Sequence, residues 1–162
     1  MSDTDTKQLH ATCVAINGHG VMLLGPSGSG KSDLALRLID DPGYGIDGEQ
    51  MIAVLIGDDQ VMLTHQSGAL SVSPATALAG LLEIRGVGIV TCPYLAQASL
   101  RLVVKLMPQA SIERLPEPSG TDFEAFGITV AAIEVDASQP SAPARVRSGL
   151  QAVLNGSLDS HR

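Results

Sequence analysis

The stretch GPSGSGKS at residues 25–32 constrains this chain more than any other feature, because it stands between the apolar run VMLL and a helical pattern. In a glycine loop, successive backbone N–H groups can point inward only where no side chain obstructs them, and the three glycines permit this. Those amides and the N-terminus of the following helix would surround anionic oxygens. The stretch therefore predicts a phosphate-binding loop made of Gly25, Pro26, Ser27, Gly28, Ser29, Gly30, Lys31 and Ser32.

Lys31 and Ser32 close this loop and give it its chemistry. The spacing assigns Lys31 to the outer phosphates of a nucleoside triphosphate and Ser32 to Mg²⁺. The plainer alternative is a flexible turn beside a surface lysine. The loop pattern predicts nucleotide binding but does not identify the acceptor of the terminal phosphoryl group. The residues on the acceptor side must therefore come from elsewhere in the chain.

The remaining segments alternate between short apolar runs and turns rich in glycine or proline, which is typical of a strand-rich domain. A helix is expected after the phosphate loop, and a second amphipathic helix is expected between Ser141 and Gly156. The proline-rich stretch 108–127 predicts a surface loop or flap. The fold class is therefore α/β, a P-loop nucleotide-binding domain with a mixed, strand-rich sheet and few helices. Strands are expected at about 11–17, 20–24, 51–56, 61–65, 69–73, 99–107 and 128–136.

The bulk properties favour one soluble acidic domain. The chain has 162 residues and a net charge of −7, which argues against a nucleic-acid surface and against an anionic membrane surface. We expect a single domain over 10–156, with tails at 1–9 and 157–162. The N-terminus is unlike a signal peptide and no apolar run is long enough for a membrane span, so a cytoplasmic location is expected. Cys13 and Cys92 lack metal-ligand spacing and are expected to be packed thiols.

Two adjacent carboxylates, Asp58 and Asp59, follow the apolar run that ends in LIG. The carboxyl end of a buried strand is the edge at which α/β sheets place their ligands. Neighbouring side chains of an extended chain point in different directions. One carboxylate could therefore face Mg²⁺ while the other accepts a proton from an incoming hydroxyl. The alternative is a strand-ending turn in which both are merely solvated.

The segment LLEIRGVGIV places Glu83 and Arg85 within an otherwise apolar run. Alternation along a strand would put both side chains on the same face. Charges beside a core need a partner or a metal, so Glu83 is a candidate Mg²⁺ ligand and Arg85 a candidate anion contact. An ion pair between the two is an equally simple interpretation.

Two further candidates, His10 and Arg114, would each be interpreted as an ordinary surface residue if taken alone. His10 precedes the first expected strand, where a lone histidine is usually a surface residue. Arg114, in the stretch IERLPEP, could reach a phosphate from the expected flap, although a solvated loop arginine is the default.

Taken in order, the segments LHATCV, GPSGSGKS, LIGDD, LEIRGVGIV and ERL resemble the catalytic domain of the HPr kinase/phosphorylase family, and the fold would then be of the HPr kinase/phosphoenolpyruvate carboxykinase type. The segment LEIRGVGI is the most specific part of this resemblance, which runs from about residue 9 to residue 155. The resemblance implies ATP and Mg²⁺ as cofactors and an HPr-type phosphocarrier protein as partner. It also implies transfer of the γ-phosphoryl group to a serine, a homo-oligomer that is usually a hexamer, and in many members the reverse phosphorolysis.

Carried over position by position, the resemblance implies that Lys31 contacts phosphate and that Ser32 and Glu83 bind Mg²⁺. It implies that Asp59 is the proton acceptor, with Asp58 in support. His10 and Arg114 match family active-site positions, and Arg85 lies in the signature segment. Two other functions stay open at this point: a P-loop kinase for a small metabolite, and a non-enzymatic ATP-binding regulatory module.

Overall fold

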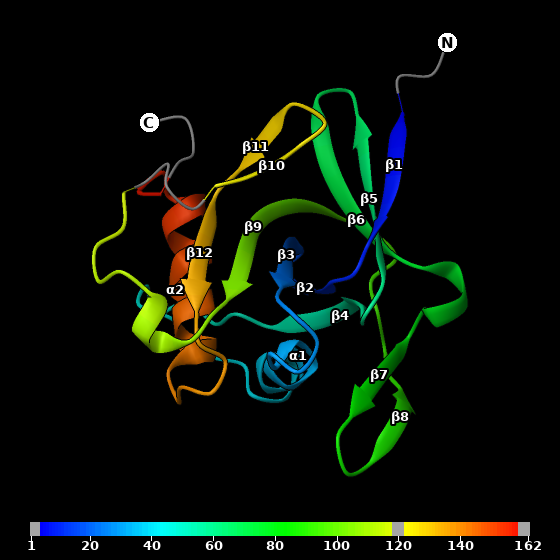
Figure 1. The fold of residues 1–162 in the computed structure, drawn as a ribbon, viewed down its shortest axis with the longest axis horizontal. Helices are drawn as coiled ribbons and strands as arrows, with labels where there is room; N and C mark the ends of the chain where they lie inside the picture. Colours follow the sequence, from blue (N-terminus) through cyan, green and yellow to red (C-terminus); the bar gives the residue numbers. More distant parts are fainter. Residues whose placement is uncertain (1–3, 118–121, 159–162) are drawn as a thin grey trace.

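The computed structural model describes residues 4–117 and 122–158. Within these residues the chain forms an eight-stranded mixed sheet (Figure 1). Seven strands lie in one path, with β12 (Ala132–Val135) paired to β9 outside it. The path runs through β1 (Asp5–Leu9), β5 (Val61–Gln66), β6 (Ala69–Pro74), β9 (Ala98–Leu106), β3 (His19–Leu24), β2 (Thr12–Ile16) and β4 (Ala53–Gly57).

The direction of the central strands brings their carboxyl ends to one edge. Strand β9 runs parallel to both β3 and β12. Strand β2 is antiparallel to both β3 and β4, so β4 runs in the same direction as β3. The loops that follow β3, β4, β9 and β12 therefore meet at the same edge, which is where α/β sheets bind ligands.

Two helices cover one face of the sheet in the described part of the chain: α1 (Lys31–Asp40) and α2 (Ala142–Leu154). The helix expected after the phosphate loop is confirmed as α1, and its residues Leu34, Ala35 and Leu38 form an apolar stripe buried against the sheet. Helix α2 packs closely on β12, since a Cβ at Gly149 would lie 2.7 Å from the Ile133 side chain. Its Ser141 occupies the N-cap position without a side-chain cap hydrogen bond.

The other face of the sheet is covered by a small hairpin made of β10 (Phe123–Ala125) and β11 (Ile128–Val130). The ring of Phe126 at its tip stacks on His65 of β5, with ring centroids 5.8 Å apart. The expected surface loop at 108–127 is thus wrong for its last part, because β10 packs its residues on the sheet. The first part does hold exposed residues and the short 3₁₀ helix η2 (Gln109–Ser111); residues 118–121 lie outside the described residues.

The expectation of a frayed N-terminal tail is wrong for residues 5–9, which form β1 antiparallel to β5. The side chains of this strand are exposed or half-buried, so its sequence carries no apolar run. Its order comes from backbone hydrogen bonds with β5. Residues 1–3 and 159–162 of the two expected tails lie outside the described residues.

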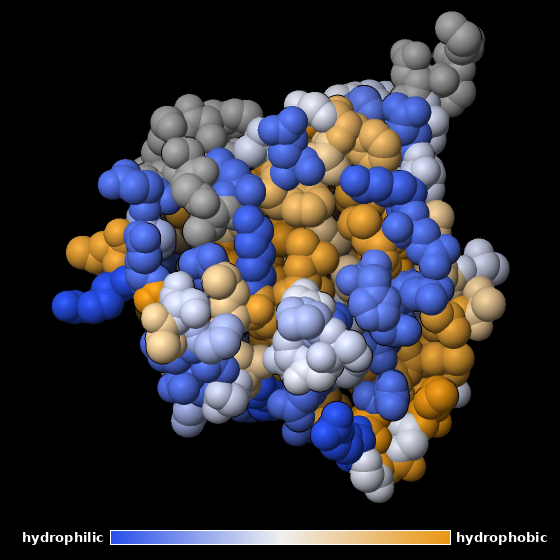
Figure 2. All heavy atoms as spheres, viewed as in Figure 1, coloured by the Kyte–Doolittle hydropathy of each residue, from blue (hydrophilic) through white to orange (hydrophobic). Residues whose placement is uncertain are grey.

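A separate hairpin projects from the sheet and carries the segment LLEIRGVGIVT (Figure 1). It consists of β7 (Leu81–Ile84) and β8 (Gly88–Thr91) and follows the 3₁₀ helix η1 (Thr76–Leu78). The expectation that its charges lie beside a core is wrong, because Val87 and Ile89 are 70% and 71% exposed. Figure 2 shows this apolar surface in orange at the lower right. None of the helices among the described residues has the length and apolar character to cross a membrane.

Candidate nucleotide and phosphoryl-transfer site

The phosphate loop leaves β3 and enters α1 as its sequence predicts. Gly28 and Gly30 have φ angles of +83° and +98°, the left-handed region that side chains disfavour. Gly30 is the N-cap of α1, and its carbonyl accepts the hydrogen bond of the Leu34 N–H at 2.9 Å. A Cβ at Gly30 would lie 2.9 Å from the Cβ of Ala137, which follows β12. Glycine is therefore required here both by the backbone angle and by the close approach of a neighbouring loop.

Gly25 is required for a different reason, since a Cβ there would lie 2.5 Å from the Ser29 hydroxyl. That hydroxyl is buried and has no hydrogen-bond partner among the described residues. A buried polar atom without a partner is costly, and an anionic oxygen in the loop would supply the missing acceptor. The buried Ser29 hydroxyl is therefore evidence for a phosphate site that does not depend on the sequence pattern.

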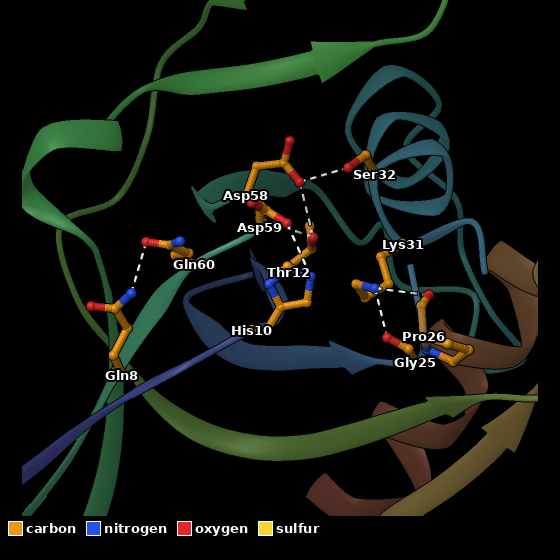
Figure 3. A network of polar contacts seen from close by, with 10 residues as sticks. All are labelled: Gln8, His10, Thr12, Gly25, Pro26, Lys31, Ser32, Asp58, Asp59 and Gln60. Carbon is orange, nitrogen blue, oxygen red and sulfur yellow. Dashed lines mark hydrogen bonds and ion pairs between the residues drawn. The ribbon is translucent and has the colours of Figure 1, made fainter. Parts of the chain in front are cut away.

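The Lys31 side chain is 7% exposed and is held at the base of the loop (Figure 3). Its Nζ donates to the carbonyl oxygens of Gly25 at 2.7 Å and Pro26 at 3.1 Å. A lysine ammonium carries three donors, so one remains for a phosphate oxygen.

Asp58 lies next to the loop and is 6% exposed. Its Oδ1 accepts hydrogen bonds from the hydroxyls of Ser32 at 2.6 Å and Thr12 at 2.9 Å. Its Oδ2 accepts the backbone N–H of Glu83 at 3.0 Å. Three donors from three separate elements thus fix the orientation of this carboxylate beside the first turn of α1 (Figure 3).

The pair of Ser32 and Asp58 fits Mg²⁺, which prefers oxygen ligands and takes few of them from the protein. Among the described residues no group of three or more His, Cys, Asp or Glu side chains forms a metal cage.

Asp59 follows Asp58 but has other partners. Its φ angle is +69°, and its carbonyl oxygen accepts the N–H of Ala11 at 3.1 Å. The side chain is 59% exposed, and its Oδ1 lies 3.2 Å from Nε2 of His10, itself 57% exposed. The two carboxylates therefore have separate partners: Asp58 accepts a hydrogen bond from Ser32 of α1, and Asp59 lies beside His10 (Figure 3).

Thr12 is a site residue that the sequence reasoning missed. It is fully buried, and its hydroxyl both donates to Asp58 Oδ1 at 2.9 Å and accepts the Asp59 N–H at 3.4 Å. The available signal was a hydroxyl residue within the otherwise apolar strand TCVAI.

The other candidates, Glu83, Arg85 and Arg114, have exposed side chains. Glu83 reaches the site through its backbone, and its side chain is exposed. Arg85, in the turn of the β7–β8 hairpin, and Arg114, in the loop after η2, are both exposed. Neither arginine makes a hydrogen bond or ion pair within the part of the chain that the structure describes, and no ion pair joins Glu83 to Arg85.

Cys13 and Cys92 are both free; Cys13 is packed in the core as expected, whereas Cys92 is half-buried. Burial raises the pKa of Cys13. Burial also raises the pKa of Cys92, with a further contribution from the negative charge of Asp58. Neither thiol is poised as a nucleophile.

The fold and the loop together define a P-loop nucleotide-binding domain of the α/β class. The family model of the HPr Serine kinase C-terminal domain matches residues 3–146. The chain belongs to this family, so the resemblance found in the sequence is confirmed.

The solved structure of the Hpr(Ser) kinase/phosphatase from Coxiella burnetii has a similar fold. It gives a TM-score of 0.73 and 24% sequence identity, covering 96% of this chain and 99% of that one. The strand-rich mixed sheet with few helices is thereby confirmed as the architecture.

Relatives named HPr kinase/phosphorylase match the chain over different lengths. The protein from Brevibacillus brevis is 32% identical over 146 residues, which is 89% of this chain and 43% of the relative. The protein from Chlorobium limicola is 30% identical over 132 residues, 80% of this chain and 36% of the relative. The one from Clostridium tetani is 36% identical over 98 residues, 60% of this chain and 29% of the relative. The chain spans less than half the length of these relatives.

Proposed function

We propose that this chain is an ATP-dependent protein serine kinase that phosphorylates an HPr-type phosphocarrier protein. The family match supports the reaction class. The observation that carries the proposal is the separation of two adjacent carboxylates, with Asp58 bonded to Ser32 and Asp59 next to His10 on the open side. One carboxylate thus serves the nucleotide and the other is accessible to a protein substrate.

In the proposed reaction the carrier serine oxygen forms a bond to the γ-phosphorus of ATP while the bond to the ADP oxygen breaks. Asp59 accepts the serine proton, because its carboxylate is exposed enough for a hydroxyl to approach. His10 positions that carboxylate at 3.2 Å. Most of the rate enhancement in such a transfer comes from positioning and charge stabilisation.

On the nucleotide side, Lys31 and the loop amides bind the phosphates, and the buried Ser29 hydroxyl gains a partner. Ser32 and Asp58 would hold Mg²⁺, which supplies charge neutralisation on the phosphates when bound. Glu83 is proposed as a further Mg²⁺ ligand, because its backbone N–H already lies 3.0 Å from Asp58 Oδ2. Arg85 and Arg114 are proposed as contacts to anionic groups from the two segments that flank the site.

The decisive experiment incubates the purified chain with radiolabelled ATP, Mg²⁺ and an HPr-type carrier protein. Mass spectrometry then identifies the modified residue. We expect a single phosphoserine, and a carrier whose target serine is replaced by alanine is the matched control. Label that appears only on small molecules would overturn the proposal and favour a metabolite kinase. Pyrophosphate release from phosphorylated carrier in the presence of inorganic phosphate tests the reverse reaction.

A cytoplasmic location and assembly into a homo-oligomer, with the hexamer usual in the family, complete the proposal. Light scattering of the purified chain after size-exclusion chromatography measures the assembly directly.

A further inference from the structure

A cavity lies at the opposite end of β9 from the phosphate loop. It has a volume of about 420 Å³, within the range of small-molecule sites. Its walls come from the start of β9, the beginning of β6, strand β11 and the end of α2, and they include Leu70, Ser99, Leu100, Arg101, Val130 and Val153. Figure 1 shows how the β10–β11 hairpin crosses from β12 towards β6 above β9.

This cavity is distinct from the nucleotide site. Leu106, at the other end of β9, lies beside the phosphate loop, since its Cβ would be 3.1 Å from a Cβ placed on Gly25. The distance from Arg101 to Leu106 along an extended strand is about 17 Å. No residue of the phosphate loop or of the carboxylate pair lines the cavity.

Arg101 is the only charged residue that lines the cavity within the described part of the chain, and it is half-buried. It makes no hydrogen bond and no ion pair there. The arginines of the helices differ: Arg37 pairs with Asp33, and Arg147 donates to the carbonyl oxygen of Asp41. A partly buried cation is costly without a hydrogen-bond acceptor or an anion. The chain carries a net charge of −7, yet none of the described carboxylates pairs with Arg101.

Arg101 acts electrostatically on His19 at the start of β3. The pKa of His19 is lowered by burial and, in addition, by the positive charge of Arg101. Two carboxylates, Asp47 and Glu49, line a different cavity together with His19.

Of the other ten described lining residues, eight are apolar. Leu70, Leu100 and Val130 are 4%, 6% and 7% exposed and form part of a fixed wall, and the partly buried Val153 of α2 closes another side. The hydroxyl residues Ser99 and Thr129 are the uncharged polar side chains of the lining. An apolar body with one anionic group matches this combination of walls and a single cation.

We propose that this cavity binds a small organic anion, with its anionic group on Arg101 and its apolar body between β11 and the end of α2. The site does not depend on the kinase reaction proposed above. Carboxylate and phosphate share the required chemistry, because guanidinium groups bind both in a bidentate manner.

Isothermal titration calorimetry with octanoate and octyl phosphate tests the proposal on the full chain. We expect at least one of the two anions to bind, and octanol and octylammonium, which share the apolar body, to bind at least tenfold more weakly. Which anion binds more tightly tells carboxylate from phosphate. Equal affinity for octanol would overturn the proposal, as would the absence of binding by either anion.

Variants assign the binding to Arg101. Arg101→Gln should weaken anion binding at least tenfold, whereas Arg101→Lys should stay within a few-fold of the wild type. Arg145→Gln removes an exposed arginine of α2 outside the cavity and should leave anion binding unchanged. Unaltered ATP binding by Arg101→Gln shows that the variant is folded. Unaltered anion binding by this variant would contradict the assignment.

Discussion

The hydroxyl of Ser32 donates a hydrogen bond of 2.6 Å to Oδ1 of Asp58. This bond joins the first turn of α1 to the end of β4 and places one hydroxyl and one carboxylate together beside the phosphate loop. In the metal-bound protein the two oxygens would share Mg²⁺ as ligands, directly or through water. On the proposed function, this contact marks the metal side of the site.

Replacing Asp58 by Asn should weaken Mg²⁺-dependent nucleotide binding at least tenfold, because the charge beside Ser32 is lost. Binding of ATP without Mg²⁺ should change much less, since the loop amides and Lys31 remain. Calorimetric titration of ATP with and without Mg²⁺ measures both quantities. An equal loss of affinity in the two titrations would show that Asp58 acts on the shape of the loop and not on the metal.

Replacing Asp59 by Asn should lower phosphoserine formation about 10²–10⁴-fold, the range expected for loss of a general base. ATP affinity should stay within a few-fold of the wild type, because Asp59 makes no contact with the phosphate loop. Single-turnover transfer to the carrier, measured beside ATP affinity, separates the two effects. Equal transfer rates in variant and wild type would remove Asp59 from the reaction and favour a non-enzymatic module.

The phosphate loop was predictable from sequence because its function depends on local residues. Gly28, Gly30 and Lys31 act through backbone angles and a side chain within one turn, so their spacing carries the signal. The two helices were predictable for a related reason, since the apolar stripe of α1 repeats within the segment itself.

The errors concern residues whose environment is set by distant parts of the chain. Strand β1 has an exposed polar sequence and is ordered by its pairing with β5. The apolar run that contains Val87 and Ile89 suggested a segment beside the core, yet these residues lie on a projecting hairpin. The role of Thr12 depends on the folded arrangement, in which β2 lies beside the end of β4.

Thr12→Val tests that role. The substitution keeps the side-chain shape but removes the donor to Asp58 Oδ1 and the acceptor of the Asp59 N–H. A lost hydrogen bond at a fully buried position should reduce the free energy of unfolding by about 1–3 kcal/mol. Urea denaturation measures this change, and Thr6→Val on the exposed strand β1 is the control, for which about 0.5 kcal/mol or less is expected. An unchanged free energy of unfolding in Thr12→Val would show that water replaces the hydroxyl as hydrogen-bond donor to the Asp58 carboxylate.

Gly30→Ala should reduce both stability and ATP affinity. Alanine at a φ angle of +98° is strained, and its Cβ would lie 2.9 Å from that of Ala137. The strain alone costs about 1–3 kcal/mol. Gly18→Ala is the matched control, because Gly18 has a φ angle of +83° but no atom within 4 Å of a built Cβ. Thermal unfolding and ATP titration of both variants separate backbone strain, which they share, from the contact with the β12 loop, which only Gly30→Ala creates.

Asp136 predicts a pH dependence of stability at the end of β12. Its pKa is lowered by hydrogen bonds from the Ser138 hydroxyl, the Ser138 N–H and the Gln109 N–H. Because the folded pKa lies below the unfolded one, this carboxylate stabilises the fold above its ordinary pKa, and the contribution is lost as the pH falls through the folded pKa.

Asp136→Asn should therefore be less stable than the wild type at pH 7, and the difference should shrink as the pH is lowered below about 4. Urea unfolding across this range measures the difference. Asp47→Asn is the control, since Asp47 is exposed and makes no hydrogen bond within the described residues. A difference for Asp136→Asn that persists unchanged to strongly acidic pH would mean that the amide fails to replace the hydrogen bonds geometrically, and that charge is not the cause.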